Sequence, residues 1–361
     1  MMTKNTPIHF ATFNVSLSAD VPGQIRSELE SNSKRIQKLA ATIQSCRPDV
    51  LLLCEFDHPG KGGDDGSLAL FCERYLEVGQ FGQDPVYYPH RYLPPTNTGL
   101  PVFSSDDASQ SPEKAQGFGR WHGQYGFVVL SRFPLLVDEV KTWQHFLWKD
   151  LPNNAIPKGY YSDDVLEHRR VSSKNHIALP IDIHGHVVTL VACHPTPPVF
   201  DGPEKRNYRR NADELKLLEA IISNEAYLVD DEGKAGGVTE DMPFVIMGDL
   251  NADSVNGDGD KEAIASLLNH ERTEKSVRPC SNGAVEYLSH GEGENKALAT
   301  HNRGLRLDYV LPSTDFNILN QGVFWPSRQE PLHSLITDSR GRLSFDAPSD
   351  HRLVWLDVTL N

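Results

Sequence analysis

Short apolar runs typical of β-strands alternate with amphipathic helical segments along the whole chain, and this alternation most constrains the fold. Residues 8–15 (IHFATFNV) and 49–56 (DVLLLCEF) are predicted strands. The segment between them is a predicted helix with its apolar side chains on one face, namely Ile36, Leu39, Ala40 and Ile43. Pro48 ends that helix, because proline cannot continue the hydrogen-bond ladder. The pattern predicts an α/β protein.

The same alternation continues to the end of the chain. Further strands are predicted at 125–133, 176–183, 186–194, 244–251, 306–313 and 352–360. Further helices are predicted at 68–77, 210–223 and 260–269. The loop-rich segment at about 89–124 resembles a linker in composition, but a chain with one strand at each end favours a single domain spanning 1–361 with a surface insertion there.

Charge and hydropathy narrow the classes of partner. With 49 acidic and 35 basic side chains the net charge is −14, which repels polyanions, so a nucleic acid is not the favoured partner. Membrane spans need roughly 18 apolar residues, and no such run is found. We expect a soluble monomer. Its compartment is left open between the cytoplasm and a secreted or periplasmic location whose leader is absent from this chain.

Polar side chains recur where the predicted strands begin or end. They are Asn14, Glu55, His194, Asp249, Asn251, Asp308, Asp350 and His351. Each alone has a structural explanation, such as a turn residue for Asn14 or a solvated strand end for Glu55. Their repetition at six apolar segments favours one shared site, since catalytic groups in α/β folds lie where strands run into loops. Such oxygen-rich sets suit Mg²⁺, Mn²⁺ or Ca²⁺ rather than zinc or copper.

The strand-end motifs also carry a resemblance. In order, they are TFNV, CEF, VACHPTPP, GDLNAD, LDYVLPS and SDHRLV. This series resembles the endonuclease/exonuclease/phosphatase superfamily, which includes pancreatic deoxyribonuclease and neutral sphingomyelinases, and it runs from about residue 8 to 358. The resemblance implies a four-layer α/β/β/α sandwich of two packed mixed β-sheets flanked by helices.

The resemblance also implies roles for the metal-side residues. Asn14 and Glu55 would help to bind a divalent ion, with Glu55 as the direct ligand, and Asp350 would be a further carboxylate on the metal side. Asp249 would activate or position the attacking water, and Asn251 would orient the nucleophile and the phosphate. The implied cofactor is Mg²⁺ or Mn²⁺, with Ca²⁺ as the third candidate.

The implied roles of the remaining motif residues concern the phosphate. His351 would contact the phosphoryl oxygens, and Asp308 would hold the His351 ring in one tautomer. His194 would lie near the leaving group or the phosphate. A cation, a carboxylate that polarises water and imidazoles that donate to developing oxyanions are sufficient for phosphoester hydrolysis.

Two groups of basic residues are further candidates for phosphate binding. Many members of the superfamily have an arginine before the strand that leads to His194, where this chain offers Lys174 or His176, and a solvated strand start is the alternative. A second group is Arg206, Arg209 and Arg210, beside Lys205. It could grip a second phosphate or a nucleic-acid backbone, or could be a solvated helix start paired with nearby acids.

The residues after Asn251 resemble a calcium loop in part. Asn256, Asp258 and Gly259 match its spacing, but Ser254 stands at the first ligand position and Ala265 at the closing one. We therefore expect Asp253 and Asp258 to form turns, with an ion or substrate contact as the alternative.

The strand-end residues and this resemblance together predict a divalent-metal-dependent phosphoester hydrolase, a phosphodiesterase or phosphomonoesterase that uses in-line attack of activated water. The first alternative is a non-specific endonuclease or exonuclease on DNA or RNA. The second is a catalytically silent binding protein, which the complete set of site residues disfavours. Substrate choice in such a fold depends on loops that carry no recognisable motif.

Overall fold

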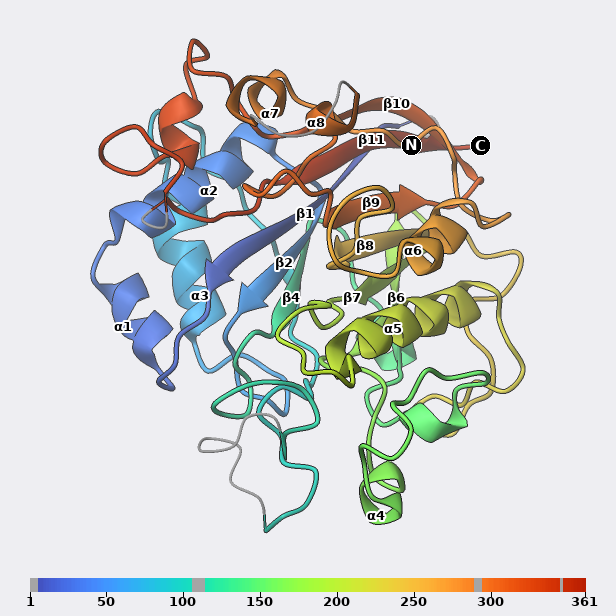
Figure 1. The fold of residues 1–361 in the computed structure, drawn as a ribbon. Helices are drawn as coiled ribbons and strands as arrows, with labels where there is room; N and C mark the ends of the chain where they lie inside the picture. Colours follow the sequence, from blue (N-terminus) through green and yellow to red (C-terminus); the bar gives the residue numbers. More distant parts are fainter. Residues whose placement is uncertain (1–5, 106–113, 289–293, 345–346) are drawn as a thin grey trace.

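Two β-sheets lie face to face at the centre of the molecule (Figure 1). The computed structural model describes residues 6–105, 114–288, 294–344 and 347–361. One sheet has six strands in the order β10-β11-β1-β2-β4-β3 and the other has five in the order β5-β6-β7-β8-β9. The strands are β1 (Ile8–Leu17), β2 (Val50–Phe56), β3 (His90–Tyr92), β4 (Phe127–Ser131), β5 (Lys141–Thr142), β6 (His176–Ile183), β7 (His186–Cys193), β8 (Phe244–Asp249), β9 (Asp308–Pro312), β10 (Phe316–Val323) and β11 (Val354–Leu360).

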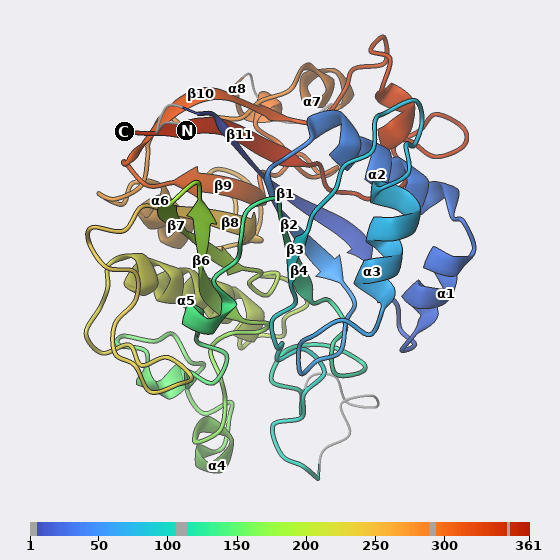
Figure 2. The ribbon, with the colours of Figure 1, turned by 180° about the vertical axis from the view of Figure 1, so that it is seen from behind.

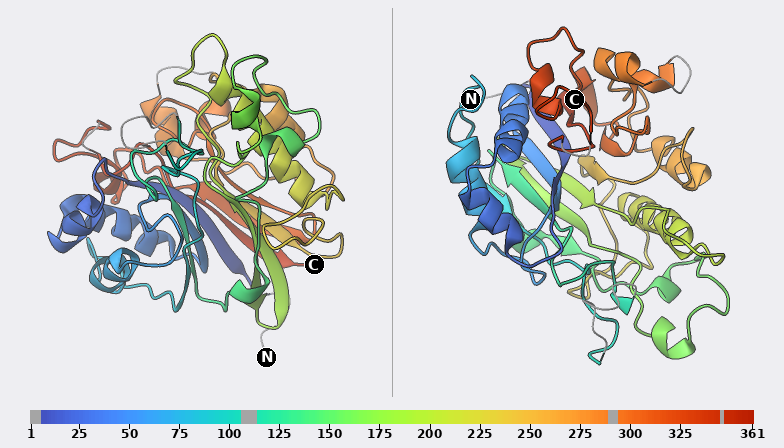
Figure 3. Two further views of the ribbon diagram at one scale, coloured as in Figure 1. Left: turned by 90° about the horizontal axis from the view of Figure 1, so that it is seen from below. Right: turned by 60° about the vertical axis from the view of Figure 1, so that its left-hand side comes forward.

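Helices form the two outer layers (Figures 2 and 3). The α-helices are α1 (Gln24–Glu30), α2 (Lys34–Cys46), α3 (Ser67–Phe71), α4 (Asp163–Leu166), α5 (Arg206–Ile222), α6 (Lys261–Leu268), α7 (Asn282–Tyr287) and α8 (Glu294–Ala297). Helices α1 to α3 cover the six-stranded sheet, and α5 and α6 cover the five-stranded sheet. The predicted four-layer α/β/β/α sandwich is therefore confirmed. Within the described ranges, no helix has both the length and the apolar character needed to cross a membrane.

The side-chain alternation along β2 shows why the layers form. Leu52 points into the core between the two sheets, whereas Leu51 and Leu53 pack with α2 side chains such as Leu39 and Ile43. Successive residues of a strand face opposite sides of its sheet, so a strand that is apolar at every position must be covered on both faces. All of these side chains are at most 1% exposed. The run 49–56 is apolar at nearly every position because it forms a central strand that is covered on both faces.

The strand directions bring distant segments to one edge of the sandwich. Strands β1 and β2 are parallel, with α2 as their crossover, and β7 and β8 are parallel, with α5 as theirs. The carboxyl ends of each parallel pair therefore lie at the same edge. Strands β9 and β11 run antiparallel to β8 and β1, so they begin at that edge. Because β1 and β2 contact β8 across the sheets, the strand ends from both sheets meet.

Three strands of the sheets were not expected from the sequence, namely β3, β5 and β10. They lie at sheet edges, and β3 and β5 have only three and two residues, which is too short for a periodic pattern. Strand β10 is longer, but most of its side chains are partly or fully exposed, and exposed Leu319 breaks the expected alternation. The predicted helix at 68–77 is also divided, because α3 ends at Phe71 and a π-helical turn follows over Cys72–Leu76.

Part of the segment at 89–124 is packed into the fold. It begins with β3, which pairs with β4. The side chain of Asn97 is buried and donates hydrogen bonds to the carbonyl oxygens of Gln144 and Ser172, at 2.8 Å each. The first part of the segment is thus built into the fold, while residues 106–113 fall outside the described residues.

Candidate functional site

Five polar side chains from the motifs GDLN, LDYV, SDH and VACH lie together where the two sheets meet: His194, Asp249, Asn251, Asp308 and His351. Asp249 is the last residue of β8 and pairs with Asp308, the first residue of β9. His194 follows β7 directly, and His351 precedes β11. The topology therefore gathers residues that are up to 157 positions apart in the chain, from His194 to His351.

The carboxylate of Asp249 is the centre of this cluster. Its Oδ2 atom accepts a hydrogen bond from Asn14 Nδ2 at 3.0 Å and lies 3.6 Å from His194 Nε2 and 3.7 Å from His351 Nε2. Its Oδ1 atom accepts one from the backbone N–H of Asn251 at 3.0 Å. The residue is 1% exposed, and burial raises the pKa of Asp249 above its ordinary value. A buried carboxylate of this kind can exchange a proton near neutral pH.

The ring of His351 is held from behind by a carboxylate. Its Nδ1 atom lies 2.8 Å from Oδ2 of Asp308, which also accepts a hydrogen bond from Thr300 Oγ1 at 2.7 Å. Burial alone would lower the pKa of His351, but the negative charges of Asp308 and Asp249 outweigh it and raise the pKa to about 10. The imidazolium form is therefore favoured at neutral pH, with its Nε2–H directed toward Asp249 and the cavity.

The pKa of the second histidine of the cluster, His194, is shifted in the opposite direction from that of His351. His194 is 3% exposed, and its Nδ1 atom is buried without a hydrogen-bond partner in the described part of the chain. Burial, followed by the positive charges of Lys174 and His351, holds the pKa of His194 well below its ordinary value. The cluster thus pairs a neutral imidazole with a charged one, and the Nε2 atoms of both lie within 3.7 Å of Oδ2 of Asp249.

Asn14 joins the cluster to the other sheet. Its Nδ2 group donates to Glu55 Oε1 at 3.1 Å as well as to Asp249, and its Oδ1 atom accepts from the backbone N–H of Ser16 at 3.1 Å. Glu55 has a left-handed backbone with φ of 55°, which is uncommon for a residue other than glycine and is often found at functional sites. One amide group therefore holds two carboxylates side by side, with Glu55 facing the cavity and Asn14 behind it.

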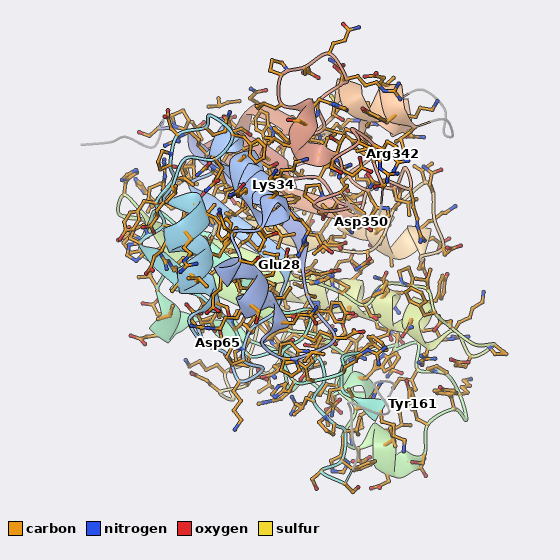
Figure 4. All side chains as sticks on the ribbon, turned by 90° about the vertical axis from the view of Figure 1, so that its left-hand side faces the viewer. Glu28, Lys34, Asp65, Tyr161, Arg342 and Asp350 are labelled. Carbon is orange, nitrogen blue, oxygen red and sulfur yellow. The ribbon has the colours of Figure 1, made fainter. Side chains whose placement is uncertain are left out.

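Asp350 lies at the exposed rim of the site, and its place in the molecule is labelled in Figure 4. Its Oδ2 atom is 3.1 Å from Nε2 of His301, whose ring packs edge-on against His351 with centroids 4.7 Å apart. Burial opposes the shift, but the His301 hydrogen bond and the charge of His351 hold the pKa of Asp350 well below its usual range. The carboxylate is therefore ionised.

Among the residues that the structure describes, two groups of side chains could hold a metal ion by distance alone. One is His301, Asp350 and His351, and the other is Asp249, Asp308 and His351. Glu55 is in neither group.

The cluster opens into a cavity of about 830 Å³. The predicted residues that line it are Glu55, Lys174, His194, Arg206, Arg210, Asp249, Asn251, Asp350 and His351. Asn14 and Asp308 are fully buried behind this surface, where they contact the lining side chains. The volume falls within the range of sites for small organic ligands, which is about 300–1,000 Å³.

Of the two basic candidates at the start of β6, only Lys174 reaches the cavity. Lys174 is 6% exposed, and within the described ranges its Nζ group makes one long hydrogen bond, 3.4 Å to the carbonyl oxygen of Pro195. His176 points the other way, with Nδ1 2.7 Å from Ser172 Oγ and Nε2 3.1 Å from the carbonyl oxygen of Glu214. Both nitrogens of His176 are thus used within the protein, and His176 is not among the residues that line the cavity.

The burial of His176 makes stability sensitive to acid. Burial lowers the pKa of His176 to about 3, whereas in the unfolded chain it is near 6.5. Between these values the unfolded chain binds a proton that the folded chain does not, so the free energy of unfolding falls as the pH falls, by about 1.4 kcal/mol per pH unit. Denaturant unfolding measured at several pH values below about 6.5 should show a shallower decline for His176→Gln than for the wild type. Equal declines would contradict this account.

The arginines of the second basic group separate in the structure. Arg206 and Arg210, one turn apart on α5, line the cavity, but Arg209 is exposed outside it, with Nε 3.1 Å from the carbonyl oxygen of Glu204. A helix places neighbours in sequence on different faces, so consecutive arginines cannot all point into one site. The phosphate-binding role considered for Arg209 is therefore not supported by its position.

Of the two turns expected after Asn251, at Asp253 and at Asp258, the first is seen in the structure. Oδ1 of Asp253 accepts hydrogen bonds from the backbone N–H groups of Val255 and Asn256, and Oδ2 accepts one from the N–H of Arg306. Both oxygens of Asp253 are thus engaged with the backbone.

Three residues at the site were missed from the sequence: His301, which binds Asp350, Thr300, which binds Asp308, and Arg169, which lines the cavity. The first two lie in an irregular segment that meets His351 by a single β-bridge. The sequence signal that could have indicated them is the polar run THNR (300–303), which comes shortly before the predicted strand at 306–313. That strand begins at the edge of the sandwich where the site lies. For Arg169 the signal was its place in a basic run shortly before Lys174.

Comparisons with known proteins agree with this geometry. The family model described as "Endonuclease/Exonuclease/phosphatase family" matches residues 11–351. An endonuclease/exonuclease/phosphatase from Beutenbergia cavernae is similar in structure, with 18% identity and a TM-score of 0.55 over 98% of this chain and 72% of that one. The human nocturnin catalytic domain is similar with 15% identity and a TM-score of 0.51, over 98% and 95% of the two chains.

A third structure, an endonuclease/exonuclease/phosphatase family protein from Bacteroides thetaiotaomicron, has 14% identity and a TM-score of 0.50 over 99% and 98% of the chains. No curated protein matches the sequence significantly. At these identities the structural matches establish the fold, whereas the family match covers nearly the whole sequence. Members of that family are generally hydrolases that act on phosphoester bonds. The chain belongs to the endonuclease/exonuclease/phosphatase family.

Proposed function

We propose that this chain hydrolyses phosphoesters with the help of a divalent cation, by one-step attack of water on phosphorus. The observation that carries the proposal is the buried Asp249 carboxylate, flanked by His194 and His351 and facing a cavity large enough for a small ester. A carboxylate with a raised pKa can accept the proton of the attacking water. The imidazolium of His351 can donate to a phosphoryl oxygen as negative charge develops there.

The donors present fit a hard divalent cation. Glu55 lines the cavity, and within the described ranges it forms no ion pair with lysine or arginine, so its carboxylate oxygens are free to bind a ligand beyond the bond from Asn14. Asp350 adds a second ionised carboxylate at the rim. Oxygen-rich sets of this kind suit Mg²⁺ or Mn²⁺. We assign Glu55 and Asp350 to the ion and Asn14 to the orientation of Glu55; the bound ion would neutralise charge on the phosphoryl group.

The remaining side chains would orient the substrate. Asn251 is fixed by a hydrogen bond from Nδ2 to the carbonyl oxygen of Pro195 at 3.0 Å, which leaves its Oδ1 atom for the nucleophilic water. Lys174 offers a buried ammonium that a phosphoryl oxygen can satisfy. In the reaction the water oxygen forms a bond to phosphorus and gives a proton to Asp249, while the bond from phosphorus to the alcohol oxygen breaks. We assign to His194, whose Nε2 atom is 3.6 Å from Oδ2 of Asp249, the relay of that proton to the departing alcohol.

Metal dependence gives the first test. Hydrolysis of bis-p-nitrophenyl phosphate and p-nitrophenyl phosphate should be abolished by a chelator and restored by Mg²⁺ or Mn²⁺. Because an ion that binds only the folded state stabilises it, Mn²⁺ should also raise the melting temperature of the metal-free protein. Glu55→Gln should remove most of that rise, and the surface variant Glu73→Gln should keep it. No turnover of either ester with any of Mg²⁺, Mn²⁺ and Ca²⁺ would instead favour a silent binding protein.

The alternative function is a nuclease with the same catalytic residues, and a DNA-nicking assay distinguishes it from a hydrolase of small esters. It predicts nicking of plasmid DNA at low salt, and loss of nicking when Arg206, Arg209 and Arg210 are neutralised together. The exposed position of Arg209 and the overall charge of −14 favour a small substrate.

A further inference from the structure

One wall of the cavity carries three arginines that the chemistry proposed above does not use. They are Arg169, Arg206 and Arg210, and we call them the arginine wall. The guanidinium carbon of Arg169 lies 5.3 Å from the ring centroid of Tyr161. Figure 4 labels Tyr161 near the lower end of the molecule and Asp350 near its middle. The arginine wall therefore lies toward the end of the cavity away from Asp350.

Arg169 is a buried cation that interacts with Tyr161 and Ala115 and still has one donor unsatisfied by the described residues. It is 5% exposed, and its Nη1 group donates to the carbonyl oxygen of Ala115 at 2.8 Å. Its Nε group is buried and finds no hydrogen-bond acceptor in the ranges that the structure describes. A buried guanidinium in this state costs free energy unless a ligand satisfies it.

The two arginines of α5 complete the wall. Arg210 is also 5% exposed and uses Nε and Nη2 to hold the carbonyl oxygens of residues 170–172, just before Lys174. Arg206 is half-buried and donates from Nη1 to Glu204 at 2.9 Å. The positive charges of Arg169 and Arg206 add to the effect of burial in lowering the pKa of Arg210 to about 10, so the three groups repel one another.

The nearby carboxylates do not balance this charge. Glu204 pairs with Arg206, and buried Glu214 accepts hydrogen bonds from Ser173 and Thr196, so two carboxylates lie beside the three arginines, while Glu214, Glu55 and Asp249 offset the charge of Lys174. The chain as a whole has a net charge of −14, so this locally positive wall has the opposite sign of charge from the rest of the protein. Fixed like charges around a cavity attract an anion.

Aromatic and apolar side chains line the same cavity. Phe118 is 55% exposed and Phe200 is 83% exposed, and both belong to the lining with Tyr125 and Pro198. Exposed rings at a cavity mouth are suited to cover the organic part of a ligand.

We propose that the cavity binds a small phosphoester whose alcohol part carries a second phosphate, with the scissile phosphate at Asp249 and the second phosphate on the arginine wall. This inference rests on the proposed function for the first site and adds the substrate class. Arginine is suited to the second site because its planar group binds phosphate oxygens in pairs. The lining of the same cavity also carries Asp253 and Asp258, so it does not form the continuous basic track that a polynucleotide needs.

Alkanediol bisphosphates of increasing chain length, each beside its monophosphate, are the probes. Binding is measured by calorimetry on Asp249→Asn, which keeps the cavity but not turnover. The bisphosphate of best length should bind at least about tenfold more tightly than its monophosphate, because two charge-assisted contacts are gained. Arg169→Gln and Arg206→Gln should each reduce this advantage to less than about threefold.

Arg209→Gln is the matched control, since it removes an arginine of the same helix that lies outside the cavity. It should leave the tenfold advantage unchanged. If Arg169→Gln does not fold, Arg206→Gln decides the question, because Arg206 is only half-buried. Equal binding of bisphosphates and monophosphates by the parent protein, or equal losses in Arg206→Gln and Arg209→Gln, would overturn the inference.

The binding experiment distinguishes failure of the second phosphate site from failure of the proposed hydrolysis. Metal-dependent hydrolysis without any bisphosphate advantage would leave the function standing and remove the second site. Tighter binding of bisphosphates without hydrolysis of any ester would support the second phosphate site and contradict the proposed function. A 12-nucleotide DNA strand that binds more tightly than every bisphosphate, with a steep loss of affinity as salt rises, would show a nucleic-acid site instead and overturn the small-substrate inference.

Discussion

Asp249→Asn is expected to reduce kcat for a chromogenic phosphoester by at least about a thousandfold while the fold is retained. The substitution keeps the shape of the side chain and one oxygen that can accept the hydrogen bond from Asn14 or from the N–H of Asn251. It removes the negative charge and the ability to take a proton from water. The loss should therefore appear in kcat, with KM changed much less.

The control for this variant is Asp258→Asn. Asp258 lines the same cavity and has the same type of side chain as Asp249, but within the described ranges it forms no hydrogen bond or ion pair. Activity of Asp258→Asn should stay within about threefold of the wild type. Both proteins should melt within a few degrees of the wild type. Asp249→Asn that turns over at near wild-type rates would remove Asp249 from the centre of the mechanism.

The layers of the fold could be predicted because each central strand carries its own signal. The run 49–56 is apolar at almost every position, and 244–251 has the same character up to the carboxylate of Asp249. Strands that are buried on both faces read this way. The edge strands could not be predicted, because β3 and β5 pair through backbone groups over two or three residues and their side chains are partly exposed.

The site divides in a similar way. Residues that directly follow or precede a strand, such as His194 and Asp308, are placed by the topology, so a sequence that reveals the strands also reveals them. His301 belongs to an irregular loop whose position depends on packing, and no periodic pattern reports it. His176 shows the remaining difficulty, because a residue at a strand start can face either side, and here it faces α5.

Gly248 illustrates how tightly the backbone is built beside the catalytic cluster. A Cβ atom at this position would lie 2.1 Å from the carbonyl oxygen of Cys193, so β7 and β8 approach more closely here than any larger residue allows. The glycine of GDLN therefore has a structural reason, which is to bring the end of β8, and with it Asp249, next to His194.

The pair of Asp308 and His351 leads to the second large effect. Asp308→Asn is expected to reduce kcat by about a hundredfold or more, because the neutral amide neither stabilises the imidazolium nor fixes which nitrogen of His351 carries the proton. Without the Asp308 charge, the pKa of His351 falls from its raised value. Activity that needs the protonated ring is lost as the pH rises through this pKa, so the alkaline limb of the kcat profile should move to lower pH.

Thr300→Ser is the matched control, since it keeps the hydroxyl that donates to Oδ2 of Asp308 and removes only a methyl group. It should retain both the wild-type rate and the wild-type pH profile. A merely structural role for Asp308 would lower the melting temperature without moving the alkaline limb, whereas a role in holding the charge of His351 moves the limb even in protein that is fully folded. Asp308→Asn with an unshifted limb and near wild-type kcat would therefore show that the proton on His351 does not take part in the reaction.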